Sequence, residues 1–469
     1  MSQKQLRCSK IEENILRIGA VFMTKKEKRK YKEKDKGIVD FLMVQNHFLK
    51  DFKCWIEEMQ DPRHQSYVTY RPSDFIYLGI LKNICAIKSM RQMEEVFNEI
   101  VCADTLRILS GNVKTKEIPH YDTLNYYLER LSPECLSDLR KKMIVSLIRG
   151  KHFYGNRLLG KYWRVILDGT ETVRFHERHC ENCLKTQVIT KEGKKEFCYS
   201  HKVLEAKLVL SEHLVVSIGS EFIENETENV KKQDCEINAG KRLMKRLKKE
   251  YPRLPICIQG DAMFAVEPVM KLCREQGWKY IFSHKDNQRI VAENYALLEE
   301  EDGKIYVKGI DKENGTGAFY NHMENLAQKT EEMNVYEYQC LKKIKEKEKK
   351  VNFRWLTNIE ITRRNLEEMI KAGRGRWKIE NEGFNNQKNG LYDICHLNSR
   401  NSKAMKNHYL LTQIADILMQ LYIAWCPLVK KINQSKKNTS SRLLESFRRQ
   451  TVTDEDVLYI ERYTTIHLE

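Results

Sequence analysis

The sequence predicts an α/β fold in which a mixed β-sheet is flanked by helices and follows a helical domain. Residues 37–150 carry apolar side chains at helical spacing, and residues 162–282 alternate between strand-like apolar runs and amphipathic helices. From residue 160 the elements read strand, strand, strand, helix, strand, helix, strand. That order is typical of a mixed sheet with helices on its faces.

The first two segments favour contact with a polyanion. Residues 1–36 form a basic arm with few apolar side chains, which suits either phosphate contacts or a solvated tail. Residues 37–150 predict a compact helical domain, in which Pro133 marks the start of one helix. Such domains often place a helix in a DNA groove, so we expect DNA binding here. A purely structural bundle would show the same pattern.

The rest of the chain divides into a catalytic core, an insertion and a tail. We expect the first part of the core at 160–284, a β-rich insertion at 285–352, the second part of the core at 353–425 and a basic C-terminal tail at 430–469. The apolar segment 402–424 predicts a helix that packs on the sheet. The strands expected in the first part of the core are 162–168, 203–210, 214–222, 254–260 and 278–282.

Charge and hydropathy narrow the class of partner. The 469 residues carry a formal net charge of +17, which favours DNA or RNA as a partner. No apolar run approaches the roughly 18 residues that suggest a membrane span, and the chain opens on polar residues rather than on a signal sequence. We therefore expect a cytoplasmic, nucleoid-associated protein with no membrane partner.

Three acidic residues are the candidate catalytic groups. Asp168 and Asp261 each end an apolar strand-like run, and ligands bind at such strand ends in α/β sheets. Glu380 lies on a predicted helix at 374–388 and shares a face with Arg376, because each helical residue turns by about 100°. An exposed ion pair between these two residues would give the same spacing. Carboxylates suit Mg²⁺ or Mn²⁺, and two such ions can clamp a phosphodiester. The basic residues that could hold a DNA phosphate beside them are Arg374, Arg376 and Lys388.

A Cys/His cluster has the spacing of a zinc site. Cys180 and Cys183 form one close pair, and Cys198 and His201 form a second after a loop of fourteen residues. The spacing predicts a structural Zn²⁺ ion in a ribbon-like insertion within residues 176–201. His176 and His179 are alternative ligands. Reduced thiols beside a surface histidine are the alternative interpretation.

Three blocks of this sequence resemble a known family. Residues 376–385 (RWKIENEGFN) are similar to the last catalytic block of insertion-sequence DDE transposases that carry a tyrosine–arginine–glutamate–lysine signature. Residues 166–170 (ILDGT) and 260–264 (GDAMF) resemble the two aspartate blocks, and the likeness spans roughly 160–425. Two positions depart from the signature. Gly373 stands where its tyrosine is expected, and Gln387, followed by Lys388, stands where its lysine is expected.

The resemblance implies an RNase H-like core and a DNA transposase. It implies metal-dependent strand cleavage and strand transfer at insertion-sequence ends, with Asp168, Asp261 and Glu380 as ligands of two Mg²⁺ or Mn²⁺ ions. It also implies double-stranded DNA, as element ends and target, and a homodimer or larger assembly. Two alternatives remain open: an RNase H-like nuclease, and a transposase-derived DNA-binding protein without catalytic activity.

Overall fold

The computed structural model describes residues 36–465 except 65–67, 178, 190–192, 229, 286–288, 311–314, 326–329, 345–346, 378–382, 427–428 and 431–434. The basic arm, apart from Lys36, therefore lies outside the described residues. The chain forms two compact units. A helical unit comprises residues up to Gly150 together with those from Gln387 onward, and a sheet unit comprises Lys151–Asn386. No described helix is both long and apolar enough to cross a membrane.

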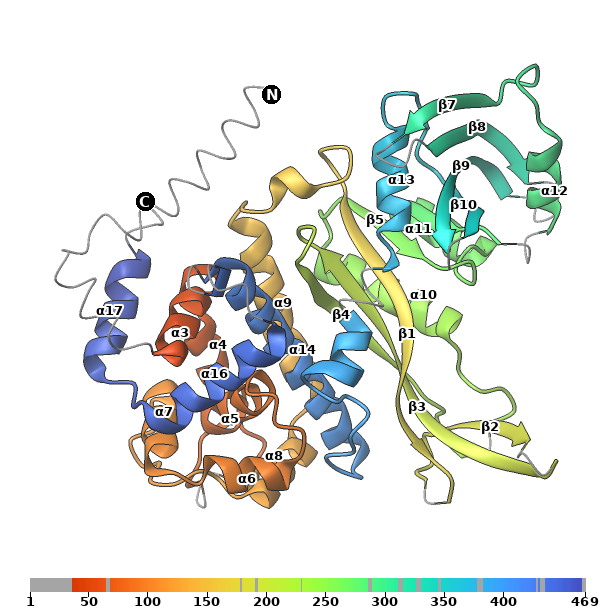
Figure 1. Ribbon diagram of the computed structural model, residues 1–469. Coiled ribbons are helices and arrows are strands. Elements are labelled where there is room, and N and C mark those ends of the chain that lie inside the picture. Colours follow the sequence, from red (N-terminus) through yellow and green to blue (C-terminus); the bar gives the residue numbers. More distant parts are fainter. Residues whose placement is uncertain are drawn as a thin grey trace. The chain divides into compact units, whose positions relative to one another are not determined.

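The helical unit is built around one long buried helix, α14 (Ser402–Trp425), which packs against α3, α5, α8 and α9 (Figure 1). Gly79 on α5 allows this close packing, since a Cβ there would lie 2.8 Å from a Leu411 methyl carbon. The apolar pattern of this segment predicted packing on the sheet, whereas its main contacts are with these four helices. Apolar residues on all sides of α14 require burial, and the surrounding helices supply it. The other helices of the unit are α3 (Gly37–Phe48), α4 (Phe52–Glu57), α5 (Pro72–Ile84), α6 (Met90–Phe97), α7 (Ile100–Ser110), α8 (Tyr121–Arg130), α9 (Pro133–Arg149), α16 (Lys436–Arg449) and α17 (Asp454–Thr465).

The sheet unit contains a large mixed sheet flanked by helices, which confirms the predicted α/β class. Its hydrogen-bonded order is β2-β3-β1-β5-β6-β10-β9-β8-β7, and β4 also pairs with β3. Strand β1 is antiparallel to β3 and parallel to β5, and β5 is parallel to β6. The strands are β1 (Trp163–Phe175), β2 (Leu184–Ile189), β3 (Lys195–Val209), β4 (Val215–Ile223), β5 (Ile256–Gly260), β6 (Lys279–Ser283), β7 (Ile305–Ile310), β8 (Gly315–Asn325), β9 (Thr330–Ile344) and β10 (Lys347–Thr357).

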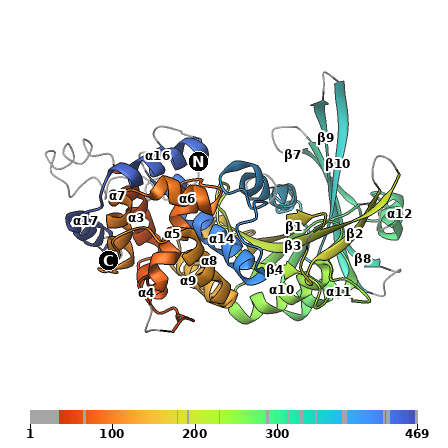
Figure 2. The same ribbon diagram turned by 90° about the horizontal axis from the view of Figure 1, so that it is seen from below.

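Two helices cover the early strands, and they follow the predicted order. Helix α10 (Glu236–Glu250) packs on β3 and β4 and also against α11 (Glu267–Glu275), which packs on β6 (Figure 2). Gly219 on β4 makes room for α10, because a Cβ there would lie 2.8 Å from Leu243. The first turn of α10 thereby lies against β1, where Glu236 meets Gly169.

The later strands extend the same sheet. Three residues at the end of β10, from Trp355 to Thr357, pair with β6, and β9, β8 and β7 then follow in antiparallel order. The sequence predicts a β-rich insertion at 285–352. The hydrogen bonds of the sheet continue from β6 into this region, because β10 pairs with both β6 and β9. Helix α12 (Arg289–Leu297) precedes β7.

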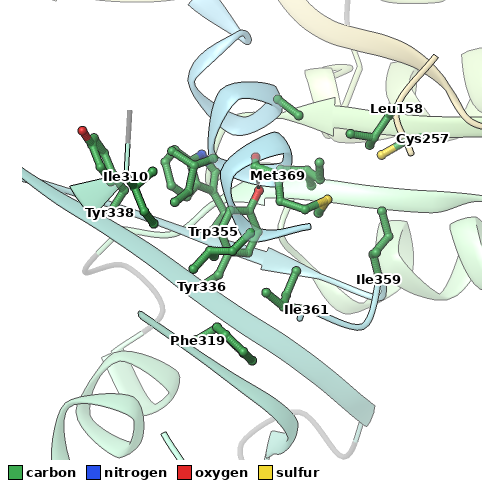
Figure 3. Packing of buried hydrophobic residues seen from close by; sticks show 14 of the residues in the cluster. Leu158, Cys257, Ile310, Phe319, Tyr336, Tyr338, Trp355, Ile359, Ile361 and Met369 are labelled. Carbon is green, nitrogen blue, oxygen red and sulfur yellow. Dashed lines mark hydrogen bonds between the residues drawn. The ribbon is translucent and has the colours of Figure 1, made fainter. Parts of the chain in front are cut away.

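A cluster of buried side chains fixes helix α13 (Leu366–Arg374) on these strands (Figure 3). The indole of Trp355 stacks on the ring of Tyr336 at 5.0 Å between centroids, and the Tyr336 hydroxyl donates a hydrogen bond to the carbonyl of Met369 at 3.1 Å. At the end of the helix, Gln259 on β5 donates a hydrogen bond from Nε2 to the carbonyl of Ala372 at 2.8 Å. The residues that follow α13 are thereby held beside β5 and β1.

Candidate active site

Asp168 and Asp261 lie next to each other where the parallel pairing of β1 with β5 ends. Asp261 follows the last residue of β5, but Asp168 does not end its strand as the sequence predicted, because β1 continues to Phe175 in antiparallel pairing with β3. The register of β1 with β5 pairs Ile166 with Gln259, and the two aspartates stand two residues further along each strand. The Asp168 Oδ1 atom accepts a hydrogen bond from the Gly169 amide at 3.0 Å. The Asp261 negative charge contributes to the electrostatic environment of Asp168. The structure therefore brings together the two aspartates that the sequence singled out.

The chain turns sharply after β5, and this turn fixes Asp261. All five residues of β5 are buried. At Gly260 an added Cβ would lie 2.9 Å from the Phe264 ring, so a larger residue would push this ring away. The Asp261 Oδ1 atom accepts a hydrogen bond from the Met263 amide at 3.0 Å, which caps the turn. The carboxylate is thus held at the edge of the sheet.

Arg376 reaches this edge from the end of α13. Its Nη1 atom lies 3.9 Å from Asp168 Oδ2, and both side chains are largely buried. Gly375 lets the chain pass close to β1, since a Cβ there would lie 3.1 Å from the Arg164 guanidinium. The arginine therefore supplies a positive charge directly beside the aspartates.

Burial dominates the electrostatics of Asp168. The pKa of the Asp168 carboxyl is raised from 3.8 to about 6, mainly by burial; Arg376 opposes the rise, and the charges of Asp261 and Glu236 contribute to it. The ionised form of Asp168 is thus destabilised in the folded protein, because water is partly excluded from the carboxyl and other negative charges lie nearby. A divalent cation would relieve both effects, which is the reason such clusters suit hard metal ions.

Glu236 is a further carboxylate at this site and was not among the residues predicted from the sequence. It is the first residue of α10, and its side chain lies against Gly169, where an added Cβ would be 2.4 Å from Glu236 Cδ. Burial raises the pKa of Glu236, Lys202 opposes this shift, and Asp261 adds to it. The feature of the sequence that could have indicated it is an acidic residue at the start of α10, the helix that follows β4.

Comparison with known proteins identifies the family. The pattern of the family described as the transposase DDE domain matches residues 159–415, which is more than half of the chain. The chain belongs to the DDE transposase family. No curated protein matches it. Among solved structures it is similar to a chain of the piggyBac transposase synaptic complex with hairpin DNA, with 12% identity and a TM-score of 0.40, covering 91% of this chain and 84% of that one.

The other candidate residues of this DDE transposase have different placements. Glu380 lies outside the described residues. Helix α13 ends at Arg374, whose guanidinium lies over the rings of Tyr338 and Phe353, at 5.4 and 5.6 Å from their centroids. Lys388 follows Gln387 in a short π-helical segment (Asn386–Gly390), and both belong to the helical unit. The structure thus brings Arg376, but not Arg374, beside Asp168.

The two departures from the family signature have structural reasons. A Cβ at Gly373 would lie 2.5 Å from the Trp355 indole, so the expected tyrosine has no room there. Gln387 is fully buried in the helical unit and donates hydrogen bonds from Nε2 to Gln413 Oε1 and Asp416 Oδ2, both at 3.0 Å. A lysine at this position would have to bury its charge.

The Cys/His cluster of the transposase brings together three of its four expected ligands. Cys180, Cys183 and His201 form a group whose possible ligand atoms lie within 4.8 Å of one another, and no other described Cys, His, Asp or Glu joins it. Cys198 does not join because it stands three residues before His201 on β3, and residues at this spacing face opposite sides of a strand. Its Sγ atom instead lies 3.6 Å from the carbonyl oxygen of Phe175.

Proposed function

We propose that this transposase hydrolyses a phosphodiester at the ends of an insertion sequence and then transfers the freed strand to target DNA. The observation that carries the proposal is that Asp168 and Asp261 lie next to each other where the parallel pairing of β1 with β5 ends, with Arg376 beside Asp168. The family match is consistent with this chemistry, and the net charge of +17 suits a DNA substrate.

The residues present fit a divalent-metal site. The donors are carboxylate oxygens, which Mg²⁺ and Mn²⁺ prefer, and the raised pKa of Asp168 shows that its ionised form lacks full compensation. Asp168 and Asp261 would hold the ions between them. When bound, two ions would stabilise negative charge on the attacking and leaving oxygens of the reacting phosphate.

Glu380 is the proposed third acid of the site. Described residues on either side of 378–382 contact β1 near Asp168. Arg376 lies beside Asp168, and Phe384 packs in a buried cluster with Ile166. Glu236 is the proposed fourth carboxylate, since its side chain lies against Gly169.

The reaction consists of two displacements at phosphorus. Water adds to the phosphate at the element end, the 3′-oxygen leaves, and a 3′-hydroxyl and a 5′-phosphate result. The freed 3′-hydroxyl then attacks a target phosphodiester and displaces its 3′-oxygen. Arg376 would orient the phosphate and offset its charge. The helical unit is the proposed DNA-binding part, and paired ends would require two or more copies of the chain.

An assay on DNA that carries the terminal repeats of the element tests the proposal. Wild type is compared with Asp168→Ala and Asp261→Ala, with Mg²⁺ or Mn²⁺. Glu171→Ala is the matched control, because Glu171 lies on the same strand but pairs with Arg174 at 2.8 Å. We expect nicking and joining in wild type and the control only. If wild type and all variants bind the DNA but none cleaves it, the result would favour a transposase-derived DNA-binding protein. If wild type cleaves the DNA but does not join it to target, the result would favour a nuclease.

A further inference from the structure

Two cysteines and one histidine, contributed by different elements, converge about one point away from the aspartates. Cys180 and Cys183 lie in the connection between β1 and β2, and His201 lies on β3 opposite Val173 of β1. Cys180 Sγ is 3.5 Å from Cys183 Sγ and 3.2 Å from His201 Nε2, and Cys183 Sγ is 3.4 Å from the same nitrogen. Three soft donors therefore form a nearly equilateral triangle.

This triangle has close to the size of one face of a tetrahedral zinc site. Zn–S bonds of about 2.3 Å and Zn–N bonds of about 2.0 Å place two thiolates roughly 3.7 Å apart, and a thiolate and an imidazole nitrogen roughly 3.5 Å apart. The three observed separations fall a few tenths of an ångström short of these values. Small outward shifts of the side chains would admit the ion.

Contacts outside the triangle hold the cysteine loop in this position. Asn225, which follows β4, donates a hydrogen bond from Nδ2 to the carbonyl of Cys183 at 2.9 Å, and its amide donates to the carbonyl of Asn182 at 3.0 Å. Within the loop, the Cys183 amide donates to the carbonyl of Cys180 at 3.3 Å. The thiols are therefore positioned by backbone contacts that do not involve His201.

The remaining candidate ligands have other contacts. Cys198 lies near the Phe175 carbonyl, as described above. His179 stacks on the ring of Tyr199 at 3.5 Å between centroids, and its Nε2 atom is 3.2 Å from a carboxylate oxygen of Glu228. Since no fourth described Cys, His, Asp or Glu joins the group, one tetrahedral position is left for water.

We propose that Cys180, Cys183 and His201 bind one Zn²⁺ ion, that water completes its coordination, and that the ion fastens the connection between β1 and β2 to strand β3. The site is independent of the DNA chemistry proposed above. The bound ion would also affect strand β3. Leu204 and Glu205, which follow His201 on β3, pair with Gly169 and Asp168 of β1, so the bound ion would steady the part of β3 that adjoins the carboxylates.

Metal content and coordination test this proposal directly. The full chain is purified under reducing conditions with added Zn²⁺, its zinc is measured by mass spectrometry, and X-ray absorption counts the ligand atoms. We expect one zinc per chain with two sulfur ligands. Cys180→Ser, Cys183→Ser and His201→Gln should each lose the metal. Cys198→Ser is the matched control, because this buried thiol lies on the same strand as His201, and it should retain the metal.

A measurement on wild type covers the case in which a variant does not fold. Alkylation followed by peptide mass spectrometry, with and without a chelator, should show Cys180 and Cys183 becoming reactive when zinc is removed, while Cys198 keeps the same reactivity. Three outcomes would overturn the proposal: absence of zinc from wild type, three sulfur ligands together with loss of metal in Cys198→Ser, or a disulfide between Cys180 and Cys183 in the reduced preparation.

Discussion

The Glu236 carboxylate lies against the backbone of Gly169, the residue that follows Asp168, so closely that a methyl group at residue 169 would be 2.4 Å from Glu236 Cδ. The glycine thus keeps a third described carboxylate next to Asp168 and Asp261. This relationship joins β1 to the first turn of α10, two elements that are far apart in the sequence.

Replacing Gly169 should therefore affect activity more than stability. In Gly169→Ala the new methyl group displaces the end of a flexible glutamate side chain, which moves at little cost to the fold. The misplaced carboxylate should lower DNA cleavage by about 10- to 100-fold. Cleavage rates and urea denaturation are measured together. Gly155→Ala is the control, since a Cβ at that position meets nothing within 4 Å. Unchanged cleavage in Gly169→Ala would show that the position of Glu236 does not matter.

Removing the charge of Asp168 should stabilise the metal-free protein at neutral pH. The folded-state pKa of Asp168 is about 6, above the ordinary 3.8, so the folded state binds more protons than the unfolded state between these values. The free energy of unfolding therefore falls as the pH rises from about 4 to about 6. Asp168→Asn escapes this loss and should gain on the order of 1–3 kcal/mol at pH 7.5.

Urea denaturation in EDTA at pH 4 and pH 7.5 checks this expectation. The gain of Asp168→Asn over wild type should be small at pH 4, where Asp168 is protonated, and full at pH 7.5. A gain of equal size at both values would mean that packing, rather than charge, causes it. Saturating Mg²⁺ should reduce the gain at pH 7.5, because a bound cation stabilises the ionised aspartate.

Arg376 should set the pH at which protons begin to compete with metal. Below the pKa of Asp168, a proton must leave before a cation binds, so the Mg²⁺ concentration for half-maximal cleavage rises as the pH falls. Arg376→Gln removes a charge that lowers the pKa of Asp168, and this rise should begin at a higher pH. The maximal rate should also fall by about 10- to 100-fold because the phosphate loses its partner. Arg374→Gln serves as the comparison, since its guanidinium lies over Tyr338. An equal displacement of the Mg²⁺ profile in both variants would contradict the assignment.

Restoring the tyrosine of the family signature should unfold the sheet unit. Gly373→Ala already places a Cβ 2.5 Å from the Trp355 indole and should destabilise the protein by about 1–3 kcal/mol. Gly373→Tyr should prevent α13 from packing on the sheet. Lys371→Ala on the same helix is the control, because that side chain is exposed and pairs with Glu367 at 2.6 Å. Thermal melting with near-UV circular dichroism gives the comparison, and a stable, active Gly373→Tyr protein would refute the steric explanation.

Features that depend on a local pattern of residues could be predicted from the sequence. Asp168 and Asp261 were found because each ends an apolar run, and the parallel pairing of β1 with β5 brings these two positions together. That β1 continues beyond Asp168 to Phe175 could not be predicted from the apolar run, because the later residues are more polar. Strand β2 escaped notice because its side chains are mostly exposed and polar, without the alternation that marks a half-buried strand. Helix α14 was predicted, but an apolar helix indicates burial without indicating which elements bury it.

Features that depend on packing between distant segments could not be predicted from the sequence. Glu236 joins the site only because α10 packs on β3 and β4 and so brings its first residue over Gly169. Cys198 and His201 have a zinc-ligand spacing that works in a turn, but both lie on β3, where three residues of separation reverse the side chain. A spacing rule therefore fails where the secondary structure differs from the one it assumes.

The division of the chain has a consequence for synthesis on the ribosome. The sheet unit is one uninterrupted stretch, Lys151–Asn386, whereas the helical unit is completed only by residues from Gln387 onward. Because α14 lies among α3, α5, α8 and α9, these early helices emerge long before the helix that buries their apolar faces. The sheet unit can close first during translation, and a stop codon before residue 387 would leave it whole while exposing the helices made at the start.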